Sequence, residues 1–251
     1  DPGEVISTSY AIFKEQMGLV LGGVVIAMII QQMSSIPLQI FSRVGPFLLA
    51  DGQVEIGVIV CVIAVLSMLF QIAVSIYTTC GILLLLLNVV KGRPAEIPDL
   101  FRGGRYFVPM LLTLMLIYFA IFLLYMVCFA PGIAIMIASD GEEAGIGIGL
   151  GVIFGGVALV YVIMFAFMLV YGMFPFVMVD RDARGISSLG QARRLSKGHR
   201  FNLFVVGLAT VGINLLGVGV CCVGLIFTVP LSYLMITVAY MRMSGQPTIS
   251  A

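Results

Sequence analysis

Five long stretches of this chain contain no Asp, Glu, Lys, Arg or His, and this segregation of charge constrains the fold more than any other feature. The stretches cover residues 16–42, 56–90, 107–138, 145–179 and 201–241. A helix needs about 20 apolar residues to cross the roughly 30 Å hydrocarbon core of a bilayer. Only 10% of the residues are charged and 61% are hydrophobic, whereas about a quarter of the residues in soluble domains are charged. The sequence therefore predicts an integral membrane protein.

The uncharged stretches predict an all-α polytopic fold with six transmembrane helices in a single domain, residues 1–251. Continuous apolarity favours helices over a β-barrel, because barrel strands alternate over about 10 residues. The last stretch can hold two spans joined by a tight turn at residues 217–224, and three others exceed 30 residues and must tilt, bend or project beyond the bilayer. We expect the spans at residues 17–40, 56–90, 107–138, 145–179, 201–220 and 222–242.

The distribution of basic residues predicts that both termini face the cytoplasm. With that orientation, every Lys and Arg except Arg43 falls in a cytoplasmic loop or tail, as the positive-inside rule requires. The loops on the other side contain acidic residues instead: Asp51, Glu55, Asp140, Glu142 and Glu143. The chain begins at Asp1 without a methionine or the features of a secretory signal, so we expect part of the native N-terminus to precede it.

Three segments that combine basic and aromatic residues precede predicted spans, about 90 residues apart. They are YAIFKEQMG at 10–18, DLFRGGRYF at 99–107 and RLSKGHRFN at 194–202. Each is followed by one span, an outer loop or turn, and a returning span. This pattern predicts three successive two-helix units, each led by a basic interfacial segment. Such repeats are familiar in transporters, and they also occur in membrane proteins that transport nothing.

The third of these segments predicts a helix at residues 186–198 that lies along the inner membrane surface. One side of this helix is apolar, with Leu189, Ala192 and Leu195. The other side gathers the basic residues Arg193, Arg194, Lys197 and Arg200. We expect the apolar side to rest on the acyl boundary, and the basic side to meet anionic headgroups or an acidic partner at about 1 kcal/mol per basic residue. The alternative is that these charges only set the topology.

Pro175, near the inner end of the fourth predicted span, predicts a bend in the helix. The bend either turns the chain onto the surface helix at residues 186–198 or opens a cavity. We expect the first of these outcomes.

Glycines repeat at four-residue spacing in two predicted spans. They are Gly147, Gly151 and Gly155 in the fourth span and Gly18 and Gly22 in the first. Small residues let helices approach closely where lipid supplies no hydrophobic driving force. The pattern predicts helix packing, either with another helix of this chain or with a different subunit. A flexible gate is the alternative.

The chain offers few groups for catalysis or metal binding. The single histidine, His199, has no carboxylate or cysteine spaced to share a metal, and we expect it at the membrane edge. No phosphate loop, dinucleotide fingerprint or nucleophile elbow is present. The predicted spans also lack the ionisable residues that proton-coupled transporters usually contain. We therefore expect no enzymatic activity, no cofactor and no metal.

The C-terminal third carries a pattern of a different kind. In PFVMVDRDARGISSLGQARRLSKGHRFNLF, residues 175–204, a proline precedes an acidic turn, and a short surface helix then ends before an aromatic residue. The residues of the pattern are Pro175, Asp180, Ser196, Lys197, Gly198 and Phe201, followed by Gly224, Pro230, Tyr240 and Arg242. The pattern resembles a bacterial family of six-helix membrane proteins of unknown function, which includes the membrane domain fused to some glycerophosphoryl diester phosphodiesterases. The resemblance implies a six-helix fold in a bacterial cytoplasmic membrane and supplies no activity.

These features favour a non-enzymatic membrane scaffold or accessory subunit of a larger bacterial membrane assembly. The expected partners are the lipid bilayer, anionic lipid headgroups and protein subunits of a membrane complex, and not nucleic acid. The alternative is a transporter or lipid-handling protein for an apolar or amphiphilic cargo, because uncharged spans are compatible with a lipid path. A cavity that faces the membrane would favour lipid handling, and a tightly packed bundle would count against it.

Overall fold

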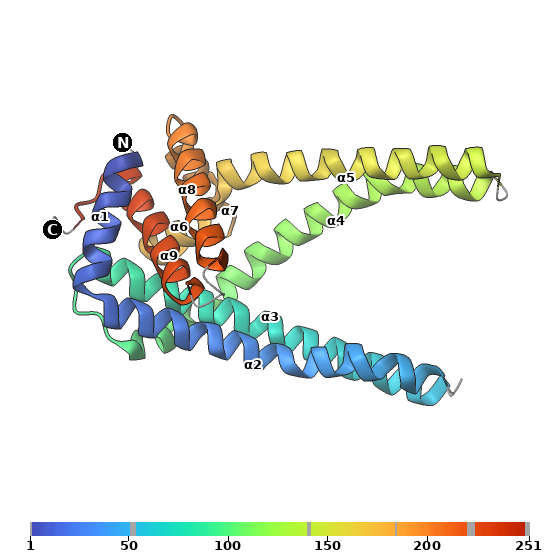
Figure 1. The fold of residues 1–251 in the computed structure, drawn as a ribbon, viewed down its shortest axis with the longest axis horizontal. Coiled ribbons are helices and arrows are strands. Elements are labelled where there is room, and N and C mark those ends of the chain that lie inside the picture. Colours follow the sequence, from blue (N-terminus) through green and yellow to red (C-terminus); the bar gives the residue numbers. More distant parts are fainter. Residues whose placement is uncertain (1, 51–53, 140–141, 184, 220–223, 249–251) are drawn as a thin grey trace.

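The protein is an all-α polytopic chain, seen in a computed structural model that describes residues 2–50, 54–139, 142–183, 185–219 and 224–248 (Figure 1). The N-terminal half contains α1 (Pro2–Glu15), α2 (Met17–Ala50), α3 (Val54–Val90), the 3-10 helix η1 (Ile97–Tyr106) and α4 (Phe107–Ala138). The C-terminal half contains α5 (Glu143–Tyr171), α6 (Phe174–Arg181), α7 (Ile186–Ser196), α8 (Arg200–Gly219) and α9 (Leu225–Met243). No strand occurs in the described ranges.

Six segments of the described chain are long and apolar enough to cross a membrane, which agrees with the predicted number. They are Met17–Arg43, Gly57–Val90, Ile97–Ala138, Glu143–Arg181, Arg200–Gly219 and Leu225–Met243. The span predicted at residues 107–138 coincides with α4. The turn predicted at residues 217–224 includes residues 220–223, which lie outside the described residues.

The span predicted at residues 145–179 lies within the candidate span Glu143–Arg181, and the bend predicted near Pro175 is a break between two helices. Helix α5 ends at Tyr171 and α6 begins at Phe174. Pro175 lies in the first turn of α6, where its missing N–H removes no intrahelical hydrogen bond. The buried residues of α6 are Phe174, Phe176, Val177, Met178 and Val179. An apolar run has the same composition whether it faces lipid or a protein core. The span predicted from the sequence therefore includes both α5 and most of α6.

The element order contains three units of an interfacial segment followed by two spanning helices. Helix α1 precedes α2 and α3, η1 precedes α4 and α5, and α7 precedes α8 and α9. The basic and aromatic pattern at residues 10–18 predicts only the last part of α1. The whole of α1 is amphipathic, because it buries Val5, Ser9, Ile12 and Phe13 along one face, and this face lies against α8 and α9.

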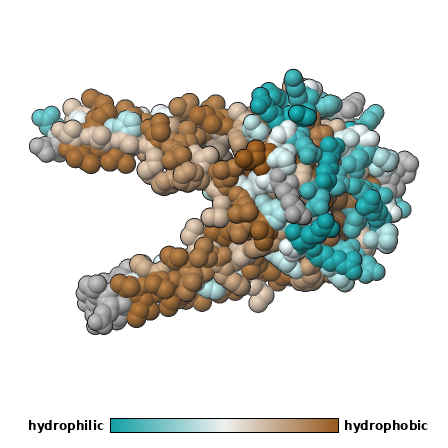
Figure 2. Space-filling view, turned by 180° about the vertical axis from the view of Figure 1, so that it is seen from behind, coloured by the Kyte–Doolittle hydropathy of each residue, from teal (hydrophilic) through white to brown (hydrophobic). Residues whose placement is uncertain are grey.

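The two long hairpins, α2–α3 and α4–α5, diverge from a common base as two separate arms (Figure 1). Apolar side chains cover the arms, whereas polar side chains gather at the base (Figure 2). Helices α2 and α3 contain 34 and 37 residues, so each is about 50–55 Å long at about 1.5 Å per residue. Because the hydrocarbon core of a bilayer is only about 30 Å thick, these helices must tilt or extend beyond it.

The hydrophobic core lies at the base and includes most of α9. The fully buried α9 side chains are Leu234, Met235, Val238, Tyr240 and Met241. Half of the apolar part of α9 is buried, compared with 6% for the Glu143–Arg181 span. The ring of Tyr240 stacks on Phe176 of α6 with a centroid distance of 5.4 Å. Packing between helices of this chain therefore holds the base together, whereas the apolar arms are largely exposed.

Candidate functional site

The four basic residues predicted to share one side of a helix at residues 186–198 do not all belong to one helix. Arg193 and Arg194 lie in the last turn of α7, Lys197 is its C-cap, and Arg200 begins α8. Arg193, Arg194, Lys197 and Arg200 are all exposed. The ion pairs found in the described part of the chain involve none of these four side chains. Helix α7 lies at the base (Figure 1), where polar side chains gather (Figure 2). This arrangement allows all four charges to meet an anionic surface or partner.

The apolar side of α7 packs against the protein, and this corrects the predicted contact with the acyl boundary. Ala192 is fully buried, and Leu189 and Leu195 pack against the hydrophobic core. The neighbours of α7 are α5 and α6. Gly185 and Gly198 flank the helix with φ values of 58° and 92°, which glycine adopts without strain. The apolar side of a surface helix has the same composition whether lipid or protein covers it, so the sequence did not distinguish the two.

A buried polar junction joins the ends of three hairpins at the base. One carboxylate oxygen of Asp180 accepts hydrogen bonds from the Tyr240 hydroxyl at 2.8 Å and from the Gln246 side-chain amide at 2.7 Å. Its other oxygen forms an ion pair with the Lys91 ammonium. The Asp180 side chain is 2% exposed and the Lys91 side chain is 15% exposed. Buried charges are stable only when they are paired and hydrogen-bonded. The junction therefore fixes the positions of α3, α6 and α9 relative to one another.

The sequence carries a signal for this junction, although the predicted contact residues do not include it. Lys91 and Asp180 are each the first charged residue after a long uncharged stretch. Since successive spans alternate in direction, the second and fourth stretches end on the same side of the membrane. A second ion pair at the base joins Arg105 of η1 to Asp182 at 2.8 Å. Both of its side chains are substantially exposed, so removing one partner should cost much less stability than removing one partner of the buried Lys91–Asp180 pair.

Helix η1 packs against α3 through two glycines that do not belong to the predicted four-residue repeats. A Cβ atom at Gly81 would lie 1.9 Å from the carbonyl oxygen of Leu100, and one at Gly103 would lie 2.6 Å from the Gly81 nitrogen. These neighbours are backbone atoms and cannot rotate away. The nearby carboxylate of Asp99 is buried and pairs with Arg102 at 2.7 Å. The close backbone contact at Gly81 and Gly103 thus holds η1 against the hairpin α2–α3.

The glycines predicted to pack do not approach another element in the described part of the chain. A Cβ atom would meet nothing within 4 Å at Gly147, Gly151, Gly155, Gly18 or Gly22. The contact between α4 and α5 uses other glycines, and a Cβ at Gly149 would lie 2.8 Å from the carbonyl oxygen of Gly132. The stripe at residues 147, 151 and 155 therefore lies on a face of α5 that no described element covers. Packing by a different subunit remains a prediction for this face.

His199 lines a pocket of about 300 Å³ between α1, α8 and α9, together with Asn202 and Arg242. Arg242 donates a hydrogen bond to the Thr8 hydroxyl at 2.9 Å and pairs with Glu4 of α1. Within the described residues, no group of three or more His, Cys, Asp or Glu side chains is placed to hold a metal ion. The pocket offers an imidazole, an amide and an already paired guanidinium, a set suited to binding polar groups.

Comparison of the chain with protein-family models, with curated proteins and with solved structures finds no match. The resemblance to the six-helix bacterial family therefore stays a prediction. Two residues of that pattern, Asp180 and Tyr240, form part of the buried junction.

Proposed function

We propose that this protein is a non-enzymatic integral scaffold or accessory subunit of a larger assembly in a bacterial cytoplasmic membrane. The uncovered glycine stripe on α5 is the observation that supports this proposal most strongly. Gly147, Gly151 and Gly155 are exposed and have no neighbour within 4 Å of a Cβ position. Such a stripe lets a helix of another subunit approach closely, so that van der Waals contacts drive association within the membrane.

The arms supply the surface on which a partner would pack. Only 11% of the apolar part of Gly57–Val90 and 6% of that of Glu143–Arg181 are buried. The contacts that connect the arms are concentrated at the base, where α3 meets η1 and α6. Partner helices on the open faces would add the packing that the chain does not supply itself.

Replacing both Gly151 and Gly155 by Leu should remove the partner, because two isobutyl groups would separate helices that need close backbone approach. The native membrane is solubilised gently, the protein is captured through a C-terminal tag, and co-purifying proteins are identified by mass spectrometry. Gly212→Leu on α8 is the matched control, since a Cβ there also meets nothing within 4 Å, and it should retain the partner. Unchanged co-purification with the double variant, or wild-type protein without a stoichiometric partner, would contradict the proposal.

In the proposed topology, both termini and the basic residues at the end of α7 lie on the cytoplasmic side, where anionic lipid headgroups attract Arg and Lys. A cysteine at Lys197, introduced after removal of the native cysteines, should react with a membrane-impermeant maleimide only in inverted vesicles. A cysteine at Glu142, which is exposed beyond the far end of α5, should react only in intact right-side-out cells or vesicles. Labelling in the reverse orientation would contradict the proposed topology.

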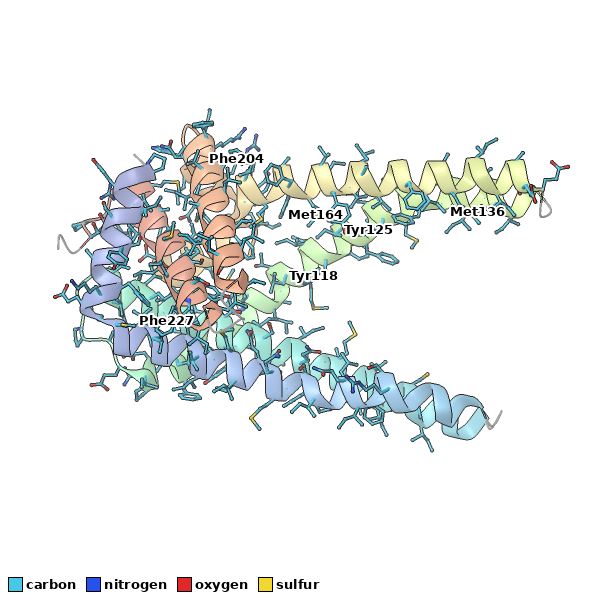
Figure 3. The ribbon with its side chains drawn as sticks, viewed as in Figure 1. Tyr118, Tyr125, Met136, Met164, Phe204 and Phe227 are labelled. Carbon is cyan, nitrogen blue, oxygen red and sulfur yellow. The ribbon has the colours of Figure 1, made fainter. Side chains whose placement is uncertain are left out.

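A lipid-handling protein is a second candidate, supported by the divergence of the helices. Helices α4 and α5 meet near their tips, where Gly132 approaches Gly149, and separate toward the base (Figure 1). At the base end, Phe204 of α8 lies edge-on to Phe165 of α5 with a centroid distance of 6.1 Å, and Tyr118 of α4 is 63% exposed (Figure 3). In the same purification, a protein without partners that is enriched in one lipid class would favour this candidate.

A further inference from the structure

An apolar groove of about 460 Å³ lies where η1 meets the first arm. Its walls come from α2, α3, η1 and the start of α4, and they include Phe70, Ala73 and Tyr77 of α3 and Phe101 and Gly104 of η1. The volume falls in the range of sites that bind small molecules or parts of larger ones. A transmembrane helix is too large for the groove, because a 10 Å length of helix about 10 Å across occupies about 800 Å³.

The groove offers no free hydrogen-bonding side chain to an occupant. The Tyr77 hydroxyl donates to the carbonyl oxygen of Phe101, and the Thr78 hydroxyl donates to the carbonyl oxygen of Val74 at 2.7 Å. The other lining side chains are hydrocarbon. Ordered water needs two to four polar partners, so the groove favours a hydrocarbon chain over water or a polar molecule.

The groove itself is apolar, and η1 carries two arginines that directly follow groove-lining residues without being part of the lining. In η1, Arg102 directly follows Phe101, and Arg105 lies one turn further; their side chains are 72% and 66% exposed. From Tyr77, which contacts η1, α3 runs about 10 Å to Phe70, away from the polar base. The base is polar and the arm apolar (Figure 2). This direction from charge to hydrocarbon is that of a phospholipid in a membrane leaflet.

The two arginines keep hydrogen-bond donors for a phosphate. Arg102 uses Nη1 in its pair with Asp99 at 2.7 Å, and Arg105 uses Nη2 in its pair with Asp182 at 2.8 Å. A guanidinium has five N–H donors and binds phosphate in a bidentate geometry. We propose that the groove binds one acyl chain of an anionic phospholipid whose phosphate contacts Arg102 and Arg105. This site does not depend on a protein partner at α5.

Filling the groove tests the acyl-chain half of the proposal. The full-length protein in detergent is titrated with phosphatidylglycerol, and the bound lipid is counted by native mass spectrometry. Ala73→Phe should weaken one-to-one binding by about tenfold or more, because the acyl chain loses several buried methylene contacts. Ala158→Phe, at an exposed position of α5, is the matched control and should bind like the wild type. Equal binding by Ala73→Phe and the wild type would overturn the proposal.

Removing one charge tests the phosphate half. Arg105→Gln should weaken phosphatidylglycerol binding by about threefold to tenfold. Arg93→Gln should not, because Arg93 is an exposed arginine whose neighbours in sequence do not line the groove. Arg105 is preferred to Arg102 because the partner of Arg102, Asp99, is buried. Diacylglycerol, which has the same acyl chains without the phosphate, should bind about tenfold more weakly than phosphatidylglycerol. Equal binding of the two lipids would exclude a phosphate contact.

A measurement on the wild-type protein keeps the test valid if a variant fails to fold. Phosphatidylglycerol with a photoactivatable diazirine on one acyl chain is crosslinked in nanodiscs, and the labelled peptides are sequenced. Labelling should be concentrated at residues 70–78 and 100–107, which line the groove. Labelling spread evenly over both arms would show ordinary bilayer contact and overturn the proposed site.

Discussion

Replacing Asp180 by Asn should lower the free energy of unfolding by about 3–5 kcal/mol, the range for breaking a buried ion pair by removing one partner. The change removes the negative charge that faces Lys91, and both side chains are largely buried. It also weakens the acceptor for Tyr240 and Gln246. The chain has no tryptophan, so unfolding is followed by far-ultraviolet circular dichroism during titration with sodium dodecyl sulfate in mixed micelles.

Asp182→Asn is the matched control for this result. Asp182 lies two residues away and also pairs with a basic side chain, but its own side chain is 44% exposed and that of Arg105 is 66% exposed. The change should cost less than about 1 kcal/mol, since asparagine also tolerates the positive φ of 53° at this position. Adding Lys91→Met to Asp180→Asn should recover part of the lost stability, because it removes the unpaired buried charge. Equal losses of stability in Asp180→Asn and Asp182→Asn would refute a special role for the junction.

Replacing Gly81 by Ala should displace η1 from α3 and cost about 3 kcal/mol, at the upper end of the usual range for overpacking. The added Cβ would overlap the carbonyl oxygen of Leu100, and the opposing element is the backbone of η1. Amide hydrogen exchange of residues 97–106 should become faster as stability is lost, because η1 would no longer pack against α3 and its amides would be exposed to solvent.

Gly22→Ala in the same arm is the control for Gly81→Ala. A Cβ at Gly22 meets nothing within 4 Å, and alanine is favoured over glycine inside a helix by about 1 kcal/mol. This variant should therefore be neutral or slightly stabilised. Unchanged hydrogen exchange of η1 in Gly81→Ala would show that the glycine contact does not hold this segment.

The predictions that succeeded depend on local composition. The number of spans follows from where charges occur along the chain. The glycine pattern did not identify the residues that contact α4, because α5 carries glycines on more than one face. Gly149 approaches α4, whereas Gly147 and Gly151 face away from it. Spacing identifies a stripe of small residues but does not say which stripe meets which helix.

The sequence by itself determined which segments are apolar enough to enter a membrane. The free energy of transfer into lipid sums over neighbouring residues, so it can be read without knowing the fold. Only the tertiary structure decided that Lys91, Asp180 and Tyr240 converge, that α6 is largely buried, and that the arms diverge beside an apolar groove. These features depend on contacts between parts of the chain that are distant in sequence. In a membrane protein, apolar residues face both the lipid and the protein core, so composition does not distinguish the two.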